Sequence, residues 1–165
     1  MKSVCRAYID IETTGFSPRY CDLTVVGVCL EHGRKREVVQ FYDGALTRDN
    51  ITAALAGADI LYSYNGARFD LPFIAAKLGV NLASEFSHCD LMHHCWDRDL
   101  WGGQKAVEVQ LGISRKTAGL DGADAVDLWL DYRENGSRRA LKTLLRYNAE
   151  DVANLALIRR RLGNR

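Results

Sequence analysis

The spacing of hydrophobic and polar positions changes along the chain and predicts a sheet followed by alternating helices and strands. Two Val-rich segments, residues 23–30 and 37–42, are typical of strands, and the polar residues 31–36 between them predict a hairpin turn. An earlier strand is indicated by three apolar residues that lead into a stretch of strand character, namely Val4, Ala7 and Ile9. The chain therefore opens with three strands in a meander.

After this meander, apolar residues at helical spacing alternate with short apolar runs. Further strands are predicted at residues 59–64 and 86–91. Helices are predicted at residues 47–56 behind a Thr47 cap, 70–78, 102–111, 121–132, and from a Ser137 cap through Leu162. This order of elements predicts an α/β fold, a three-layer α/β/α domain in which a central mixed sheet lies between helices.

Composition fits a single globular domain over residues 1–165, since 47% of the residues are hydrophobic and 26% are charged. The formal net charge is +1, so no strong overall field attracts polyanions, and any contact with nucleic acid has to be local or mediated by metal. The five scattered cysteines indicate free thiols in a reducing compartment. No signal-peptide-like run and no stretch of about 18 apolar residues occurs, so we expect a cytoplasmic protein without a membrane partner.

Two carboxylates lie two residues apart on the first predicted strand, in Asp10-Ile11-Glu12. Residues at this spacing project from the same face of a strand, so both carboxylates share one small site. Side by side they would repel each other, and we therefore predict a cation between them. An acidic solvent face on an edge strand is the alternative. Because Ile9 and Ile11 are apolar and a Thr-Thr-Gly turn follows, we favour an interior strand with the carboxylates at its carboxyl end.

Two further acids and one tyrosine are candidates for the same site. Asp70 follows a predicted strand and starts a predicted helix, so it can face the first pair, although, taken by itself, a simple N-cap role is the preferred interpretation. Asp151 lies close to the apolar stripe of the final helix, and a carboxylate at a largely buried position needs a partner. Tyr147 precedes Asp151 by four residues and shares its face if the helix is continuous. Glu150 points elsewhere, and we interpret it as solvent-exposed.

Three motifs follow one another along the chain: Asp10-x-Glu12 within Asp-Ile-Glu-Thr-Thr-Gly, Asn65-Gly66-x-x-Phe69-Asp70-x-Pro72, and Tyr147-x-x-x-Asp151. In order and spacing they resemble the motifs of the DEDD superfamily of 3′-to-5′ exonucleases in its tyrosine subclass, DEDDy. Within this superfamily the chain is most similar to the YprB-like ribonuclease-H-like group, and more distantly to the proofreading domains of family B DNA polymerases. The resemblance covers nearly the whole chain and implies a ribonuclease-H-like fold with a five-stranded mixed sheet.

The resemblance implies a phosphodiester hydrolase that uses two Mg²⁺ or Mn²⁺ ions and acts on single-stranded DNA or RNA with a free 3′ end. Hard carboxylate oxygens also favour these metals over zinc. By resemblance, Asp10 bridges two ions about 4 Å apart, Glu12 and Asp151 bind one of them, and Asp70 acts largely through water. Tyr147 would position the attacking water, because a phenol is a poor base at neutral pH.

The same resemblance implies which residues surround the substrate. Thr13, Thr14 and Phe16 would border the terminal nucleotide, and Asn65 would line the cleft. For Phe16, packing under a loop is an equally favoured alternative. Trp101 could stack on a base or belong to the core.

Basic residues in two segments are weaker candidates for phosphate contacts. Lys105, Arg115 and Lys116 follow the Gly102-Gly103 loop and are the better ones. The Arg159-Arg160-Arg161 run also suits a helix C-terminus, where cations complement the helix dipole, and we favour that interpretation.

A group of histidines and cysteines suggests a competing metal site, formed by His88, Cys89, His93, His94 and Cys95. Because no second cluster of this kind lies elsewhere, we favour helix-surface histidines and core cysteines over zinc ligands. A zinc-dependent interaction module and a catalytically idle nuclease-like scaffold are the alternative functions. The presence of all five expected functional residues favours the enzyme.

Overall fold

The computed structural model describes residues 4–163, in which five strands form one mixed sheet. The strands are β1 (Cys5–Thr13), β2 (Leu23–His32), β3 (Lys35–Tyr42), β4 (Ile60–Ser63) and β5 (His88–Asp90). Their order in the sheet is β3-β2-β1-β4-β5, with β2 antiparallel to both β1 and β3, β4 parallel to β1, and β5 parallel to β4. The five-stranded mixed sheet predicted from the sequence is confirmed.

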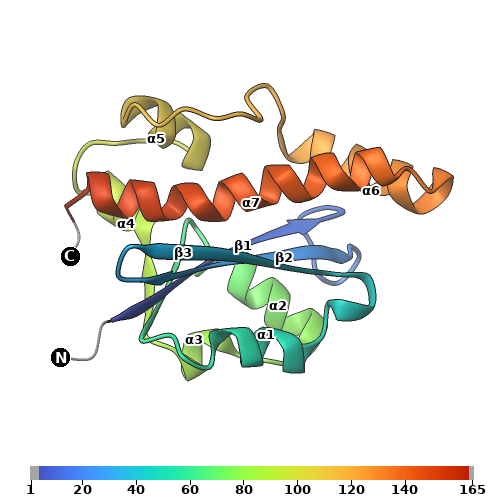
Figure 1. Cartoon of the computed structure of the whole chain (residues 1–165), viewed down its shortest axis with the longest axis horizontal. Coiled ribbons are helices and arrows are strands. Elements are labelled where there is room, and N and C mark those ends of the chain that lie inside the picture. Colours follow the sequence, from blue (N-terminus) through green and yellow to red (C-terminus); the bar gives the residue numbers. More distant parts are fainter. Residues whose placement is uncertain (1–3, 164–165) are drawn as a thin grey trace.

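Helices cover both faces of this sheet (Figure 1). Below it in the view lie α1 (Arg48–Leu55), α2 (Asp70–Leu78) and α3 (Leu82–Glu85), while a short 3₁₀ turn, η1 (Asp43–Ala45), follows β3. On the other side lie α4 (Leu91–Trp96), α5 (Gln104–Gln110), α6 (Gly122–Asn135) and the long α7 (Arg138–Arg161), which runs across the sheet. Within residues 4–163, none of these helices has both the length and the apolar surface that crossing a membrane requires.

Alternation along β1 divides its side chains between two apolar cores. Ile9 and Ile11 pack in the core that the sheet shares with α1, α2 and α3, whereas Tyr8 packs in the core shared with α4, α5 and α7. Asp10 and Glu12 have the same parity as Tyr8 and therefore face α7. The strand thus directs two carboxylates toward the longest helix of the fold.

The connection between β2 and β3 is shorter than predicted. Glu31 and His32 still pair with Arg36 and Lys35, so the turn is confined to residues 33–34. Gly33, with φ of +61°, provides the left-handed conformation that this tight turn needs. Glu31 is 1% exposed, and its carboxylate accepts hydrogen bonds from Arg159 at 2.8 Å and from Arg160 at 2.9 Å. The prediction that Glu31 belongs to the turn is therefore wrong. These arginines also do more than complement the helix dipole, because they pair with a buried acid.

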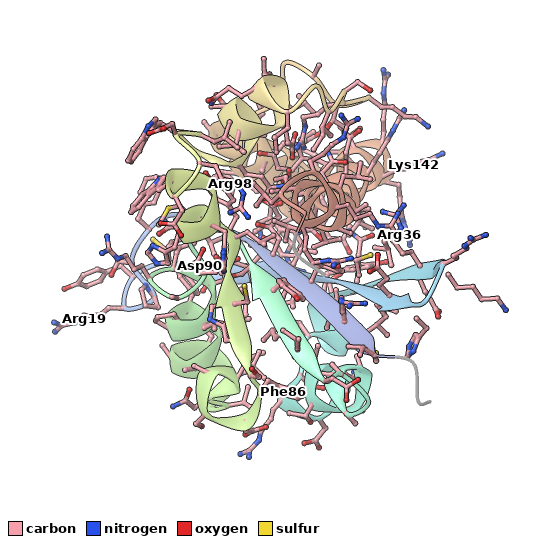
Figure 2. The ribbon with its side chains drawn as sticks, turned by 90° about the vertical axis from the view of Figure 1, so that its left-hand side faces the viewer. Arg19, Arg36, Phe86, Asp90, Arg98 and Lys142 are labelled. Atoms are coloured by element: carbon pink, nitrogen blue, oxygen red, sulfur yellow. The ribbon has the colours of Figure 1, made fainter. Side chains whose placement is uncertain are left out.

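Asp90 ends β5 and organises the sheet edge at which the site lies. The predicted strand at residues 86–91 is shorter than expected at both ends. Phe86 is the C-cap of α3, and the Asp90 carboxylate accepts a hydrogen bond from Met92 N at 3.1 Å and so caps α4. It also accepts hydrogen bonds from Asn65 N at 2.8 Å and Ala67 N at 3.2 Å. Figure 2 shows Asp90 where β5 leads into α4. This one side chain thus joins the loop after β4 to the end of β5.

Candidate active site

Three carboxylates gather near the carboxyl end of β1. Asp10 and Glu12 face α7, which places Asp151 beside them, and one oxygen of each acid lies within 4.8 Å of the other two. Glu12 and Asp151 are buried, whereas Asp10 is half-buried. An oxygen-only set of this kind suits Mg²⁺ or Mn²⁺, so this acidic cluster could bind such a metal.

Asp70 approaches the same cluster from the other side of β1. It is 4% exposed, and its Oδ1 accepts a hydrogen bond from Ile11 N at 3.1 Å. It lines one cavity together with Asp10 and Asp151 but lies outside the group of three close ligands. The alternative that Asp70 serves only as N-cap is wrong, because Phe69 occupies the N-cap position and Asp70 is the first residue of α2.

Burial and mutual repulsion make all four acids reluctant to ionise. Burial, followed by the charge of Asp151, raises the pKa of both Asp10 and Glu12 well above the ordinary range. Burial raises the pKa of Asp70 to about 7 and that of Asp151 to about 6, although the Arg115 guanidinium opposes the second shift. A divalent cation would relieve the repulsion that these acids share, so the electrostatics of the site fit a metal ion.

Asn148 joins the carboxylates of β1 to Gln40 on the edge strand β3, and it was not identified from the sequence. Its Nδ2 donates to Asp10 Oδ2 at 3.2 Å and to Glu12 Oε1 at 3.4 Å, while its Oδ1 accepts from Gln40 Nε2 at 2.9 Å. Gly27 lies opposite both Asp10 and Gln40 in the sheet, and a Cβ at Gly27 would lie 2.2 Å from Asn148 Oδ1. The glycine therefore provides the space that α7 needs to approach β1.

Arg115 supplies a counter-charge to the acidic cluster. Its Nη2 donates to Asp151 Oδ1 at 2.6 Å, and its Nη1 donates to both oxygens of Glu108, at 2.9 and 2.8 Å. Glu108 lies on α5 and is fully buried, so the guanidinium is enclosed between two acids. Arg115 is thus engaged by carboxylates and holds Asp151 in place, instead of being available to a phosphate.

Glu150 was predicted to be solvent-exposed, but in the structure it is half-buried and hydrogen-bonded. Its carboxylate accepts hydrogen bonds from Lys116 N at 2.6 Å and from Thr117 N at 2.9 Å, and also from the Thr117 hydroxyl. These contacts fasten the loop after α5 onto α7, beside the Arg115 ion pairs. Glu150 is therefore part of the support of the site.

Tyr147 lies on the continuous helix α7, as its spacing from Asp151 required, and is 4% exposed. Lys105 Nζ donates to the Tyr147 hydroxyl and to Leu120 O, and lies 4.3 Å from the centre of the Tyr147 ring. Because an ammonium group only donates, the Tyr147 oxygen is the acceptor in this bond and its own proton can be donated elsewhere. Burial raises the pKa of Tyr147, so the phenol stays protonated at neutral pH.

Two cavities, of about 800 and 510 Å³, meet at the acidic cluster. Both are lined by Asp10, Phe69, Tyr147 and Asp151. The larger cavity also contacts Asn65, Trp101 and Lys105, and the smaller one contacts Glu12, Thr13, Thr14 and Phe16. Phe16 is 91% exposed, so the alternative that it packs under a loop is wrong. All nine residues predicted for the site therefore line one or both cavities.

The histidines and cysteines at positions 88–95 serve other purposes. His88 Nε2 is hydrogen-bonded to Ser63 Oγ at 2.8 Å, Cys95 is buried in the apolar core, and His93 packs edge-on against Trp96. Within the part of the chain that the structure describes, these residues do not bring three ligand atoms together as the acids at β1 do.

Several solved structures share this fold. A family B DNA polymerase from the hyperthermophilic archaeon Pyrobaculum calidifontis superposes with a TM-score of 0.72 at 18% identity, over 96% of this chain and 24% of the polymerase. NrnC of Brucella melitensis with bound Mg²⁺ superposes with a TM-score of 0.63 at 21% identity, over 99% of this chain and 74% of NrnC. NrnC bound to pGG gives a TM-score of 0.62 at 22% identity over the same shares of both chains. The chain thus spans about a quarter of the polymerase and most of NrnC.

A family comparison agrees with these structural similarities. No functionally curated protein matches the chain. The family model described as the RNase_H superfamily, however, matches residues 7–163. The matched range includes all five strands apart from the start of β1, and also every residue of the acidic cluster. The chain therefore belongs to the ribonuclease H superfamily and has the fold of its nucleases.

Proposed function

We propose that this protein is a metal-dependent 3′-to-5′ exonuclease of the DEDDy subclass, close to the YprB-like group, that degrades single-stranded nucleic acid. The observation that carries the proposal is the convergence of Asp10, Glu12 and Asp151 within 4.8 Å, with Tyr147 in the same cavity. Asp70 adds the fourth acid from across β1. These five residues also occur in the order and spacing of the DEDDy motifs.

The comparisons support the same class of reaction. NrnC of Brucella melitensis has been captured with Mg²⁺ and with pGG, and another similar structure, at 23% identity, is described as the apo form of a nuclease. The polymerase similarity covers 24% of that enzyme, which suits a nuclease domain within a larger protein.

The acids are proposed to hold two Mg²⁺ or Mn²⁺ ions through Asp10, Glu12, Asp70 and Asp151. When bound, the ions lower the pKa of the attacking water and stabilise charge on the leaving 3′ oxygen. Asn148 orients Asp10 and Glu12, and Arg115 orients Asp151. The raised pKa values of the acids mean that metal binding has to displace protons at neutral pH.

Tyr147 is proposed to position the water that attacks phosphorus. Its oxygen accepts a hydrogen bond from Lys105, so its own proton can be donated to the water oxygen. The water adds to phosphorus, the bond from phosphorus to the 3′ oxygen of the preceding nucleotide breaks, and that oxygen takes up a proton. The products are a 5′-mononucleotide and a strand shortened by one nucleotide, which carries a new 3′-hydroxyl.

A single gel assay tests the activity and its direction. Single-stranded DNA and RNA, labelled at either end, are incubated with Mn²⁺, Mg²⁺ or EDTA, and the wild type should release the 3′ label as mononucleotide only with metal. Asp10→Asn should be inactive, whereas Glu134→Gln, at an exposed position on α6, should match the wild type. A circular or 3′-phosphorylated strand should resist. Cutting of the circle would indicate an endonuclease, and metal-independent binding without cleavage would indicate an idle scaffold.

Thermal unfolding tests the metal site independently of catalysis. A ligand that binds only the folded state raises the melting temperature, so millimolar Mn²⁺ should stabilise the wild type relative to EDTA. Asp10→Ala should lose this shift because it removes the proposed bridging ligand. An equal shift in both proteins would show that the ion binds elsewhere.

A further inference from the structure

Trp101 is an exposed aromatic residue at the rim of the larger cavity. It is 57% exposed, yet it lines the same 800 Å³ cavity as Asp10, Asp70 and Asp151. An aromatic ring that stays open to solvent on the wall of a cavity is available to stack on a planar ligand such as a base. The resemblance to the exonucleases gives this residue no role.

The ring of Trp101 is held in place although it is exposed. It stacks on Trp96, with ring centroids 5.8 Å apart and an angle of 24° between the planes. Its carbonyl accepts a hydrogen bond from Gln110 Nε2 at 2.8 Å, and the next carbonyl, of Gly102, accepts one from the Tyr64 hydroxyl at 2.6 Å. The indole is therefore supported by Trp96, and it still keeps more than half of its surface exposed and available to a planar ligand.

A second exposed aromatic residue, Phe16, lines the smaller cavity, on whose wall Asp10 and Asp151 also lie. Phe69 lines both cavities, and its ring centroid is 6.3 Å from that of Phe16. A single strand whose phosphodiester lies at the acidic cluster has one base on each side of that phosphate. The two cavities with their exposed rings match this arrangement, and Lys105 adds a cation in the larger one.

We propose that Trp101 is the stacking platform for the base of the penultimate nucleotide, on the 5′ side of the bond that is cleaved. This inference rests on the proposed function, in which Phe16 borders the terminal nucleotide. Stacking on an aromatic ring tolerates every base, so the platform adds affinity without sequence preference. The ligand is thus a single strand of at least two nucleotides, of any sequence.

Binding of short single strands in Ca²⁺ tests this assignment even if the protein does not cleave them. Dissociation constants are measured by fluorescence anisotropy for an intact strand, for a strand with an abasic penultimate position, and for one with an abasic terminal position. Trp101→Ala should weaken binding of the intact strand by about 5- to 150-fold, the range expected for loss of one base–aromatic stack. Trp101→Phe should retain most of the affinity, and Val109→Ala, an exposed position on the outside of α5, should retain all of it.

The abasic strands decide where the base lies. For the strand without a penultimate base, Trp101→Ala and the wild type should bind equally, because the stacking partner is already missing. An equal loss with every strand, or no loss with the intact strand, would overturn the platform. A loss that disappears only with the terminal abasic strand would assign Trp101 to the terminal base and overturn the proposed position. If the wild type never cleaves but shows the predicted pattern, the exonuclease proposal fails while the platform stands.

Discussion

Replacing Asp70 by Asn tests whether the acids are held together against their repulsion. Asp70 is 4% exposed, and the hydrogen bond that its Oδ1 accepts from Ile11 N can equally be accepted by an amide oxygen. Asp70→Asn therefore removes one charge and preserves the shape of the site. In the metal-free protein, we expect this change to increase stability.

The size of the gain follows from the pKa of Asp70, which is raised from 3.8 to about 7. One pKa unit corresponds to about 1.4 kcal/mol, so ionised Asp70 destabilises the folded state by roughly 4 kcal/mol at about pH 8. Between the two pKa values the folded state binds more protons than the unfolded state. The contribution of Asp70 to wild-type stability is therefore greatest below about pH 4 and is lost as the pH rises through 7. Asp70→Asn should exceed the wild type by roughly 4 kcal/mol at about pH 8, but by less than about 1 kcal/mol at pH 4.

Urea unfolding in EDTA, followed by circular dichroism at both pH values, measures this difference. Glu134→Gln serves as the control, because it removes an exposed carboxylate of α6 and should change stability little at either pH. Saturating Mn²⁺ should narrow the gap, since the wild type gains more from the ion. The reasoning is refuted if Asp70→Asn is no more stable than the wild type near pH 8, or if its gain does not depend on pH.

Three further substitutions address the support of the site. Arg115→Met leaves two buried acids without their counter-charge and should lower the free energy of unfolding by about 3–5 kcal/mol; an unchanged urea midpoint would contradict the ion pairs. Gly27→Ala places a Cβ 2.2 Å from Asn148 Oδ1 and should destabilise the fold by about 1–3 kcal/mol and weaken Mn²⁺ binding measured by calorimetry. Adding Asn148→Ala should partly restore the stability, because it removes the clashing amide. Tyr147→Phe should keep fold and metal affinity while kcat and kcat/KM fall together by about 10²- to 10⁴-fold; wild-type turnover would refute its role.

The acids could be located from the sequence because their placement depends on local periodicity. Alternation along one strand brought Asp10 and Glu12 to one face, and the spacing of the final helix paired Tyr147 with Asp151. The mixed sheet followed in the same way from hydrophobic patterns. These features depend on neighbours within a few residues, which is the range over which such patterns are informative.

The residues that hold the acids in place, Arg115 and Asn148, could not be found in this way, because they contact residues that are distant in sequence. Arg115 meets Asp151 across 36 positions, and this pairing depends on the path of the loop after α5. Two signals were nevertheless available. Asn148 is a polar residue on the apolar stripe of the last helix, and Gly27 interrupts a Val-rich strand, which indicates close approach of another segment.

Two buried polar contacts, one near the middle of α7 and one in its last turn, fix the register of this helix on the sheet. Asn148 bonds to the acids of β1, and Arg159, roughly 16 Å farther along the helix, bonds to Glu31 and to the Tyr8 hydroxyl. An apolar stripe alone would lose little burial if the helix slid or rotated slightly, because leucines and isoleucines can exchange partners. Two directional anchors permit no such shift, and a metal site needs its ligands placed to within about 0.5 Å. The contacts of Arg159 with Glu31 and Tyr8 thus help to fix the position of Asp151 along the helix axis. Substitutions at these residues can therefore alter the site without contacting it.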